Sequence, residues 1–202
     1  MNLEEKIKHK LNHLKPTVTI VYSSSGTVIK ETRDMAGNMS ATKIDVLSPG
    51  YVIDNTPDLS ISHILPWLSM GSQDVSHDYE LLKSNKITHI LSIGVPCPNY
   101  EDIKTTFIEA YDLEEFRIID VFEESNLLID STRTEDALIY VHCNAGVSRS
   151  VTIVAAYLIR FYKISHSEAL DMIRRVRPKV NPNRGFVKQL EEYASQINQR
   201  LN

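Results

Sequence analysis

The sequence predicts an α/β fold in which a central, twisted and largely parallel sheet is flanked by helices on both faces. Two observations predict it. Short apolar, β-prone runs alternate with helical patterns through most of the chain, and one such run leads through a glycine-containing loop into a long apolar helix. Alternation of this kind is typical of parallel sheets that bind ligands beyond the carboxyl ends of their strands. A chain of 202 residues is long enough for one domain of ordinary size with an extension.

The first part of the chain, residues 1–47, is predicted to be an N-terminal extension. Apolar positions within residues 4–14 recur with the spacing of one helix face. Residues 18–28 contain two β-prone stretches separated by serines and a glycine, which predicts a hairpin. Residues 33–57 lose this periodicity and carry Gly, Asn, Ser and Pro, so we expect a linker with the domain boundary near Leu47.

Residues 48–202 are predicted to form the main domain, whose elements alternate between strand and helix. In chain order they are a strand over 61–68, a helix over 74–84, strands over 87–93, 116–119 and 138–142, and a buried helix over 151–162.

Two further helices are predicted after this buried helix. Ser165 and Glu168 have the spacing of a capping box, and the helix that they open should end before Pro178. Arg177, immediately before that proline, is expected to have a structural role. The last helix takes its apolar stripe from four positions: Phe186, Leu190, Tyr193 and Ile197.

The segment from His142 to Ser150 reads His-Cys-Asn-Ala-Gly-Val-Ser-Arg-Ser and joins the last predicted strand to the buried helix. Unpaired backbone N–H groups and the macrodipole at a helix N-terminus favour an anion. Gly146 allows a positive φ or a close approach to a ligand, and the planar fork of Arg149 can hold two phosphoryl oxygens. We therefore expect phosphate to bind to Asn144, Ala145, Gly146, Val147, Ser148 and Arg149.

Cys143 is the candidate nucleophile in this loop, because a cysteine six positions before an arginine suits attack on a phosphate monoester. A helix N-terminus and nearby cations can lower the pKa of a thiol from about 8.5 to roughly 3.5–7.5. Ser148 and Ser150 could donate hydrogen bonds to the thiolate, and Ser150 is expected to help it leave. The alternative is a buried cysteine that acts as a small hydrophobe. Cys97 is remote in sequence and no zinc-ligand spacing is present.

This loop resembles the signature of the cysteine-dependent protein tyrosine phosphatases, and its Ala-Gly-Val-Ser-Arg-Ser core resembles the dual-specificity branch, in particular its small atypical group. The run Arg-Pro-Lys-Val-Asn-Pro-Asn-Arg-Gly-Phe from Arg177, followed by Gln189, also resembles that branch. The resemblance implies a protein phosphatase that hydrolyses phosphotyrosine and phosphoserine or phosphothreonine through a phosphocysteine intermediate.

The family protonates the leaving group with an aspartate on a separate loop, and two residues compete for this role. Asp120 matches by context because it follows the predicted strand over 116–119, but relatives usually have a longer segment between acid and cysteine. Asp112 lies nearer the usual distance but precedes that strand. We favour Asp120 and expect the next helix to be shortened to residues 127–136. A surface role for both carboxylates stays open, and so does a catalytically impaired, phosphate-binding scaffold.

The resemblance implies phosphorylated proteins as partners, with kinases of a mitogen-activated pathway among the candidates. A basic and then hydrophobic pattern loosely resembles a kinase docking motif, formed by Lys6, Lys8, Lys10 and Lys15 with Leu11 and Leu14. A solvated amphipathic helix that packs on the domain explains these residues as well. A net charge of −4 gives no general attraction for nucleic acid. We expect no membrane span, no metal and no organic cofactor, and a location in the cytoplasm, with the nucleus as the alternative.

Overall fold

The computed structural model describes most of the chain, in five stretches: residues 17–22, 28–34, 38–44, 56–134 and 137–199. The chain divides into two compact units, Met1–Asn55 and Thr56–Asn202. The predicted helix over 4–14 and the predicted boundary near Leu47 lie outside the described residues.

The first unit contains a three-stranded antiparallel sheet in the order β1-β2-β3. β1 (Thr17–Tyr22) pairs with β2 (Val28–Arg33), which confirms the predicted hairpin. The prediction of a linker is wrong for residues 39–44, because they form β3 (Met39–Ile44) on the other side of β2. Backbone hydrogen bonds to β2 define this strand, and they do not require the apolar alternation that the prediction used.

The second unit is built on a five-stranded sheet in the order β4-β5-β8-β6-β7. Its strands are β4 (Ser62–Leu65), β5 (Leu68–Gly71), β6 (His89–Ile93), β7 (Lys104–Ile108) and β8 (Ile139–His142). β4 pairs antiparallel with β5, and the other pairings are parallel. The predicted fold class is therefore confirmed.

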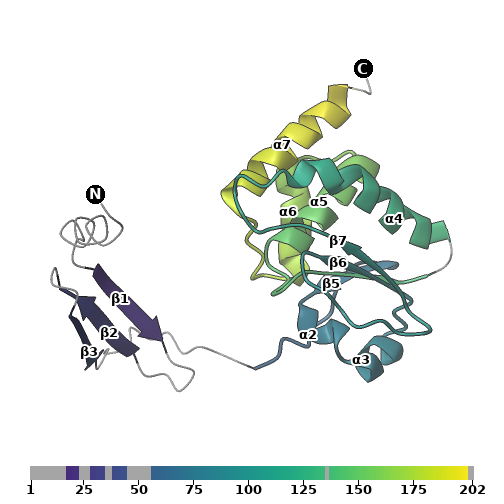
Figure 1. Cartoon of the computed structure of the whole chain (residues 1–202). Coiled ribbons are helices and arrows are strands. Elements are labelled where there is room, and N and C mark those ends of the chain that lie inside the picture. The colour runs from purple at the N-terminus through teal and green to yellow at the C-terminus, as the bar shows by residue number, and fades with distance from the viewer. Residues whose placement is uncertain (1–16, 23–27, 35–37, 45–55, 135–136, 200–202) are drawn as a thin grey trace, which may run out of the picture. The chain divides into compact units, whose positions relative to one another are not determined.

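Helices cover both faces of this sheet (Figure 1). They are α2 (Gln73–Ser76), α3 (Tyr79–Ser84), α4 (Phe122–Thr134), α5 (Arg149–Tyr162), α6 (His166–Val176) and α7 (Arg184–Gln199), with a 3-10 helix η1 (Ile118–Val121) before α4. The larger core lies between the sheet and α4 to α7, where Leu91 and Val141 meet Ile153. The smaller core lies under α2 and α3, where Val75 and Leu82 pack with Tyr140.

Residues 116–119 do not form the predicted strand. They lead into η1, and the strand that precedes this region is β7, which the sequence analysis missed. β7 lies at the edge of the sheet and has a mixed burial pattern, so its Lys-Thr-Thr-Phe-Ile sequence gives a weak apolar signal. The following helix is not shortened to residues 127–136 but begins at Phe122.

Other predicted elements are confirmed with changed boundaries. The strand over 61–68 is two strands that turn at Pro66 and Trp67, and the helix over 74–84 is two short helices. α6 has the predicted capping box between Ser165 and Glu168 and ends before Arg177. The four apolar positions predicted for α7 are buried.

The parallel topology brings the carboxyl ends of β5, β8, β6 and β7 to one edge of the sheet. Gly71, Cys143, Gly94 and Ala110 therefore lie at or just beyond neighbouring strand ends. Among the described residues, no helix is long and apolar enough to cross a membrane. In the same residues, no group of His, Cys, Asp or Glu side chains is arranged to hold a metal ion.

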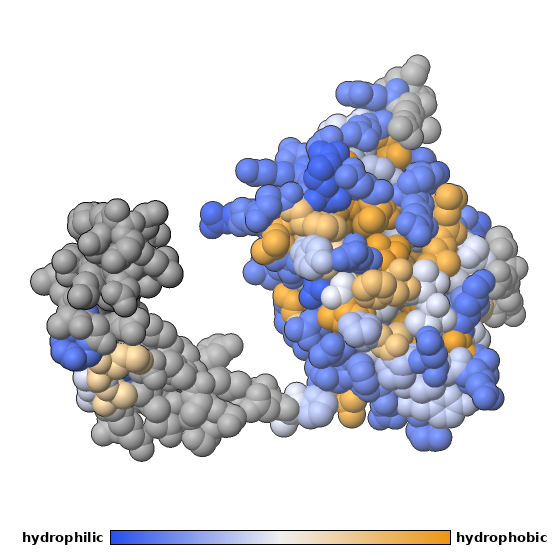
Figure 2. Space-filling view, viewed as in Figure 1, coloured by the Kyte–Doolittle hydropathy of each residue, from blue (hydrophilic) through white to orange (hydrophobic). Residues whose placement is uncertain are grey.

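Figure 2 shows that hydrophilic residues cover much of the visible surface of the second unit and that hydrophobic residues gather near the middle of this face. Exposed apolar side chains include Phe107 on β7 and Tyr111 and Leu113 just after it. This stretch between β7 and η1 also carries Asp112.

Candidate active site

The Cys143 loop, residues 143–149, is held in place by hydrogen bonds that surrounding groups donate to the carbonyls of residues 143–148. His142 Nδ1 donates to the Cys143 carbonyl, and Gln73 N donates to that of Asn144. Arg177 donates through Nη2 to Ala145 and through Nε to Gly146. Asn181 N donates to the Val147 carbonyl, and Thr152 N donates to that of Ser148. Within a planar trans peptide the C=O and the next N–H point in opposite directions. Carbonyls that point outward to these donors leave the loop N–H groups directed inward, as an anion-binding nest requires.

Gly146 has a φ of +65°, in the left-handed region. A Cβ at this position would lie 2.3 Å from the carbonyl oxygen of Gly71 and 2.7 Å from Arg177 Nη2. Glycine is therefore required here for both its backbone conformation and its lack of a side chain.

Cys143 lies at the start of this loop and is 2% exposed. Its Sγ is 3.2 Å from the hydroxyl of Ser150. Ser150 lies in the first turn of α5, directly after Arg149. The preceding His142 is fully buried, and burial lowers its pKa to about 4, so the ring is neutral at pH 7. Because a carbonyl can only accept, Nδ1 of His142 donates to the Cys143 carbonyl at 3.2 Å.

Arg149 reaches across the carboxyl ends of β6 and β7. Its Nη1 donates to the carbonyls of Ile93, Gly94 and Ala110 at 3.1–3.3 Å. Its Nε is buried and has no hydrogen-bond partner among the described residues. A guanidinium that is fixed through one nitrogen and keeps another N–H unpaired is prepared for an oxyanion ligand.

Asp112 is the carboxylate that the structure places at the Cys143 loop. Its Oδ1 accepts hydrogen bonds from the Ser148 hydroxyl at 2.7 Å and from Asn183 Nδ2 at 2.8 Å. Its Oδ2 lies 3.9 Å from Arg149 Nε. The Ser148 hydroxyl, predicted to bind phosphate or the thiolate, thus holds this carboxylate.

Asp120 is not brought to the Cys143 loop. It lies in η1, and its carboxylate pairs with Arg117, at 3.0 Å from Nη2 and 3.1 Å from Nε, with both side chains exposed. The context argument for Asp120 depended on a strand over residues 116–119, and that strand does not exist. Asp112 follows the true strand β7, so context and spacing both favour it.

The Asp112 segment, residues 109–117, is fastened to the start of α7. Asn183 holds the carboxylate of Asp112, and Gln189 Nε2 donates to the Phe116 carbonyl at 2.8 Å. A Cβ on Gly185 would lie 1.9 Å from the Glu114 carbonyl oxygen, so this glycine permits the close contact. Asn183, Gly185 and Gln189 were not predicted as site residues. The signal in the sequence was the Asn-Pro-Asn-Arg-Gly-Phe run, which resembles the dual-specificity branch.

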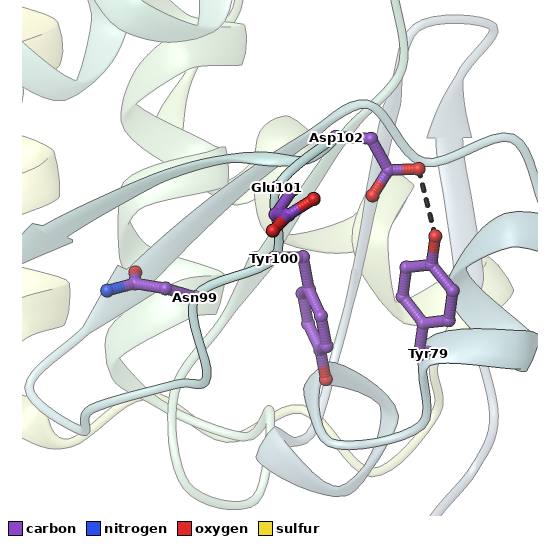
Figure 3. A pocket seen from close by; sticks show the side chains of 5 residues that line it. All are labelled: Tyr79, Asn99, Tyr100, Glu101 and Asp102. Carbon is purple, nitrogen blue, oxygen red and sulfur yellow. Dashed lines mark hydrogen bonds between the residues drawn. The ribbon is translucent and has the colours of Figure 1, made fainter.

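A separate pocket of about 510 Å³ is lined by Tyr79, Asn99, Tyr100, Glu101 and Asp102 (Figure 3). The Tyr79 hydroxyl donates to the Asp102 carboxylate at 2.9 Å, and Lys83 pairs with the same carboxylate. None of the lining residues belongs to the Cys143 loop or the Asp112 segment, so this pocket is distinct from the candidate active site.

Comparisons with known proteins agree with this geometry. Residues 68–196 match the family model "Dual specificity phosphatase, catalytic domain". The chain is 40% identical to dual specificity protein phosphatase 19 of Mus musculus, over 71% of this chain and 66% of that protein. It is 34% identical to the probable dual specificity protein phosphatase DDB_G0283417 of Dictyostelium discoideum, over 98% of this chain and 99% of that protein.

Among solved structures, the crystal structure of DUSP15 aligns with a TM-score of 0.63 and 35% identity, covering 70% of this chain and 97% of that one. The sequence match, the fold and the position of the cysteine loop lead to the same conclusion. The chain belongs to the dual specificity phosphatase family.

Proposed function

We propose that this phosphatase hydrolyses phosphotyrosine, phosphoserine and phosphothreonine in proteins through a phosphocysteine intermediate on Cys143. One observation carries the proposal: Cys143 begins a loop whose carbonyls, from residue 143 to residue 148, all accept hydrogen bonds. The loop ends at Arg149, whose Nε is buried and has no hydrogen-bond partner among the described residues. The candidate nucleophile and the arginine that would neutralise phosphate therefore belong to one short loop whose shape is fixed by hydrogen bonds.

In the first step the Cys143 thiolate attacks phosphorus, the S–P bond forms and the P–O ester bond breaks. The inward N–H groups and Arg149 hold the equatorial oxygens while negative charge shifts to the leaving oxygen. We assign Asp112 in place of Asp120 as the acid that protonates this oxygen. Its Oδ2 supports this role, because hydrogen bonds to Oδ1 fix the carboxyl group and Oδ2 faces Arg149.

In the second step water attacks the phosphocysteine and the P–S bond breaks, which releases inorganic phosphate and restores the thiolate. The Asp112 carboxylate takes the proton from water. Ser150 stabilises the leaving thiolate by a hydrogen bond, because its hydroxyl lies 3.2 Å from Cys143 Sγ.

The substrates that we propose are phosphorylated proteins, with kinases of a mitogen-activated pathway among them. The Cys143 loop contains no lysine for the additional phosphates of an inositol lipid, which favours phosphoproteins as substrates. The alternative is a scaffold that binds phosphate without turnover. The position of Asp112 favours the enzyme, because a scaffold needs no carboxylate beside the arginine.

The proposal is tested by incubating the wild type and Cys143→Ser with an aryl phosphate, quenching with acid and measuring intact mass. We expect the wild type to release phosphate and to carry one phosphoryl group on Cys143, and the variant to do neither. Hydrolysis that survives Cys143→Ser would contradict the phosphocysteine mechanism. A wild type that binds a phosphopeptide but releases no phosphate would favour the scaffold.

A further inference from the structure

The leading segment of the second unit, residues 58–60, lies before the stretch matched by the family model, residues 68–196. It nevertheless contacts the Cys143 loop through one buried side chain. That side chain is Arg177, which is 2% exposed and connects the loop to Asp58 and Ser60.

Arg177 makes four hydrogen bonds that fix its guanidinium plane. On the loop side, Nε donates to the Gly146 carbonyl at 2.8 Å and Nη2 donates to the Ala145 carbonyl at 3.0 Å. On the other side, Nη2 donates to Asp58 Oδ2 at 2.6 Å and Nη1 donates to the Ser60 hydroxyl at 3.3 Å. The planar guanidinium of an arginine can donate to the loop carbonyls and to Asp58 and Ser60 at the same time, whereas an ammonium group cannot.

Asp58 supplies the negative charge that this buried cation needs. Burial by itself would raise the pKa of the Asp58 carboxyl, but hydrogen bonds from Lys179, Ser60 and Arg177 outweigh it and hold that pKa well below its usual range. The carboxylate therefore stays charged throughout the working pH range of an enzyme. An unpaired buried guanidinium would be strongly unfavourable, so Asp58 fixes where Arg177 can lie.

The backbone of Asp58 is itself anchored. Its N–H donates to the Asp74 carboxylate at 2.8 Å, and its carbonyl accepts from the Ser72 hydroxyl at 2.7 Å. Ser72 caps α2 just beyond the end of β5. The leading segment is thus attached to the strand-end region beside the Cys143 loop, and its carboxylate is held in a defined place.

We infer that Asp58 is a positioning residue for phosphate binding, acting through Arg177 on the peptide groups of Ala145 and Gly146. The carbonyl of Ala145 shares a peptide plane with the N–H of Gly146, and the carbonyl of Gly146 shares one with the N–H of Val147. When Arg177 holds these carbonyls outward, the two N–H groups point to the inside of the loop. The inference rests on the proposed assignment of this loop as the phosphate site.

The test compares Asp58→Asn and Arg177→Lys with the wild type. Each protein is measured for binding of inorganic vanadate by calorimetry, for kcat and KM on an aryl phosphate, and for thermal unfolding. Asp58→Asn removes the charge with little change of shape. Arg177→Lys keeps the charge pair with Asp58 but cannot donate to both carbonyls. We expect vanadate affinity and kcat/KM to fall together by about ten- to a hundredfold in both variants, since loss of a charged hydrogen bond has this size.

The matched control is Asp102→Asn. It also breaks an ion pair of an aspartate with a lysine, here Lys83. Asp102 lines the separate pocket (Figure 3) and does not contact the Cys143 loop. We expect this variant to retain wild-type vanadate affinity and kinetics.

A purely structural Asp58 would lower the unfolding temperature and leave both vanadate affinity and kcat/KM at wild-type values, which would overturn the inference. If Asp58→Asn does not fold, wild-type affinity in a folded Arg177→Lys would overturn it equally. Vanadate binding without turnover in the wild type would contradict the proposed function, while the binding constants would still decide the role of Asp58.

Discussion

The Cys143 loop and the Asp112 segment lie side by side but are held in different ways. Six consecutive carbonyls of the loop are bonded to groups around it, and buried Arg177 connects it to the leading segment. The Asp112 segment is held by the side chains of Ser148 in the loop, Asn183 just before α7 and Gln189 within α7. Its Tyr111 and Leu113 are more than half exposed. Under the proposed mechanism, this difference makes the phosphate site preorganised, whereas delivery of the proton depends on how the start of α7 holds a more exposed segment.

The largest effect is expected from replacing the carboxyl group of Asp112 with an amide. Asp112→Asn should lower kcat on an aryl or alkyl phosphate by about 10²–10⁴-fold, the usual contribution of a general acid. Vanadate affinity should stay close to wild type, because the Cys143 loop is unchanged. Steady-state kinetics and vanadate inhibition measured together check this separation.

Asp120→Asn is the matched control for that substitution. Its exposed ion pair with Arg117 contributes little to stability and lies away from the Cys143 loop. We therefore expect kcat to change by less than about twofold. A large loss in Asp120→Asn together with an active Asp112→Asn would restore the sequence-based assignment.

Gly146→Ala should distort the Cys143 loop. The new Cβ would meet the Gly71 carbonyl at 2.3 Å in a backbone with positive φ. The loop N–H groups would be displaced, and displacement of about 1 Å can cost about 10²-fold in rate. Unlike Asp112→Asn, this variant should lose vanadate affinity as well as kcat/KM. Wild-type vanadate binding in a folded Gly146→Ala would contradict the preorganised loop.

Gly185→Ala should disturb the Asp112 segment, because the new Cβ would lie 1.9 Å from the Glu114 carbonyl oxygen. The Asp112 segment would be pushed away from α7, and we expect about a tenfold loss of kcat from misplacing the acid. The loss should be greater for an alkyl phosphate than for an aryl phosphate with a good leaving group, since the latter needs protonation less. Equal losses on both substrates would show that the glycine does not act through Asp112.

The smallest effect concerns stability, through the buried His142 behind the loop. Its pKa of about 4 in the folded protein lies below the ordinary value near 6.5, so the unfolded chain binds more protons between these pH values. The free energy of unfolding should therefore fall as the pH is lowered through this window, by at most about 1.4 kcal/mol per pH unit.

Urea denaturation at several pH values checks this prediction. His142→Asn should flatten the pH dependence, and the same change at the exposed His63 should leave it as in the wild type. An unchanged slope in His142→Asn would mean that other groups cause the acid sensitivity.

How much was predictable from the sequence depended on how local each feature is. The strand, loop and helix around Cys143 were predicted because a short apolar run, a glycine and a long apolar run follow one another directly. The context argument favoured Asp120 because it took residues 116–119 as the strand. The true strand, β7, is a half-exposed edge strand whose pairing with β6 gives little apolar pattern. The spacing argument, which does not depend on where strands lie, favoured Asp112.

The sequence by itself determined the chemical groups of the Cys143 loop and the family, because nucleophile, glycine and arginine lie within one short contiguous segment at the end of a strand. Only the tertiary structure decided which carboxylate faces Arg149 and which residues hold the loop. Asp112, Arg177 and Asp58 come from distant parts of the chain, and their contacts depend on strand order and helix packing. Local patterns carry no information about such distances, because the physical interactions that set them form only when the sheet is assembled.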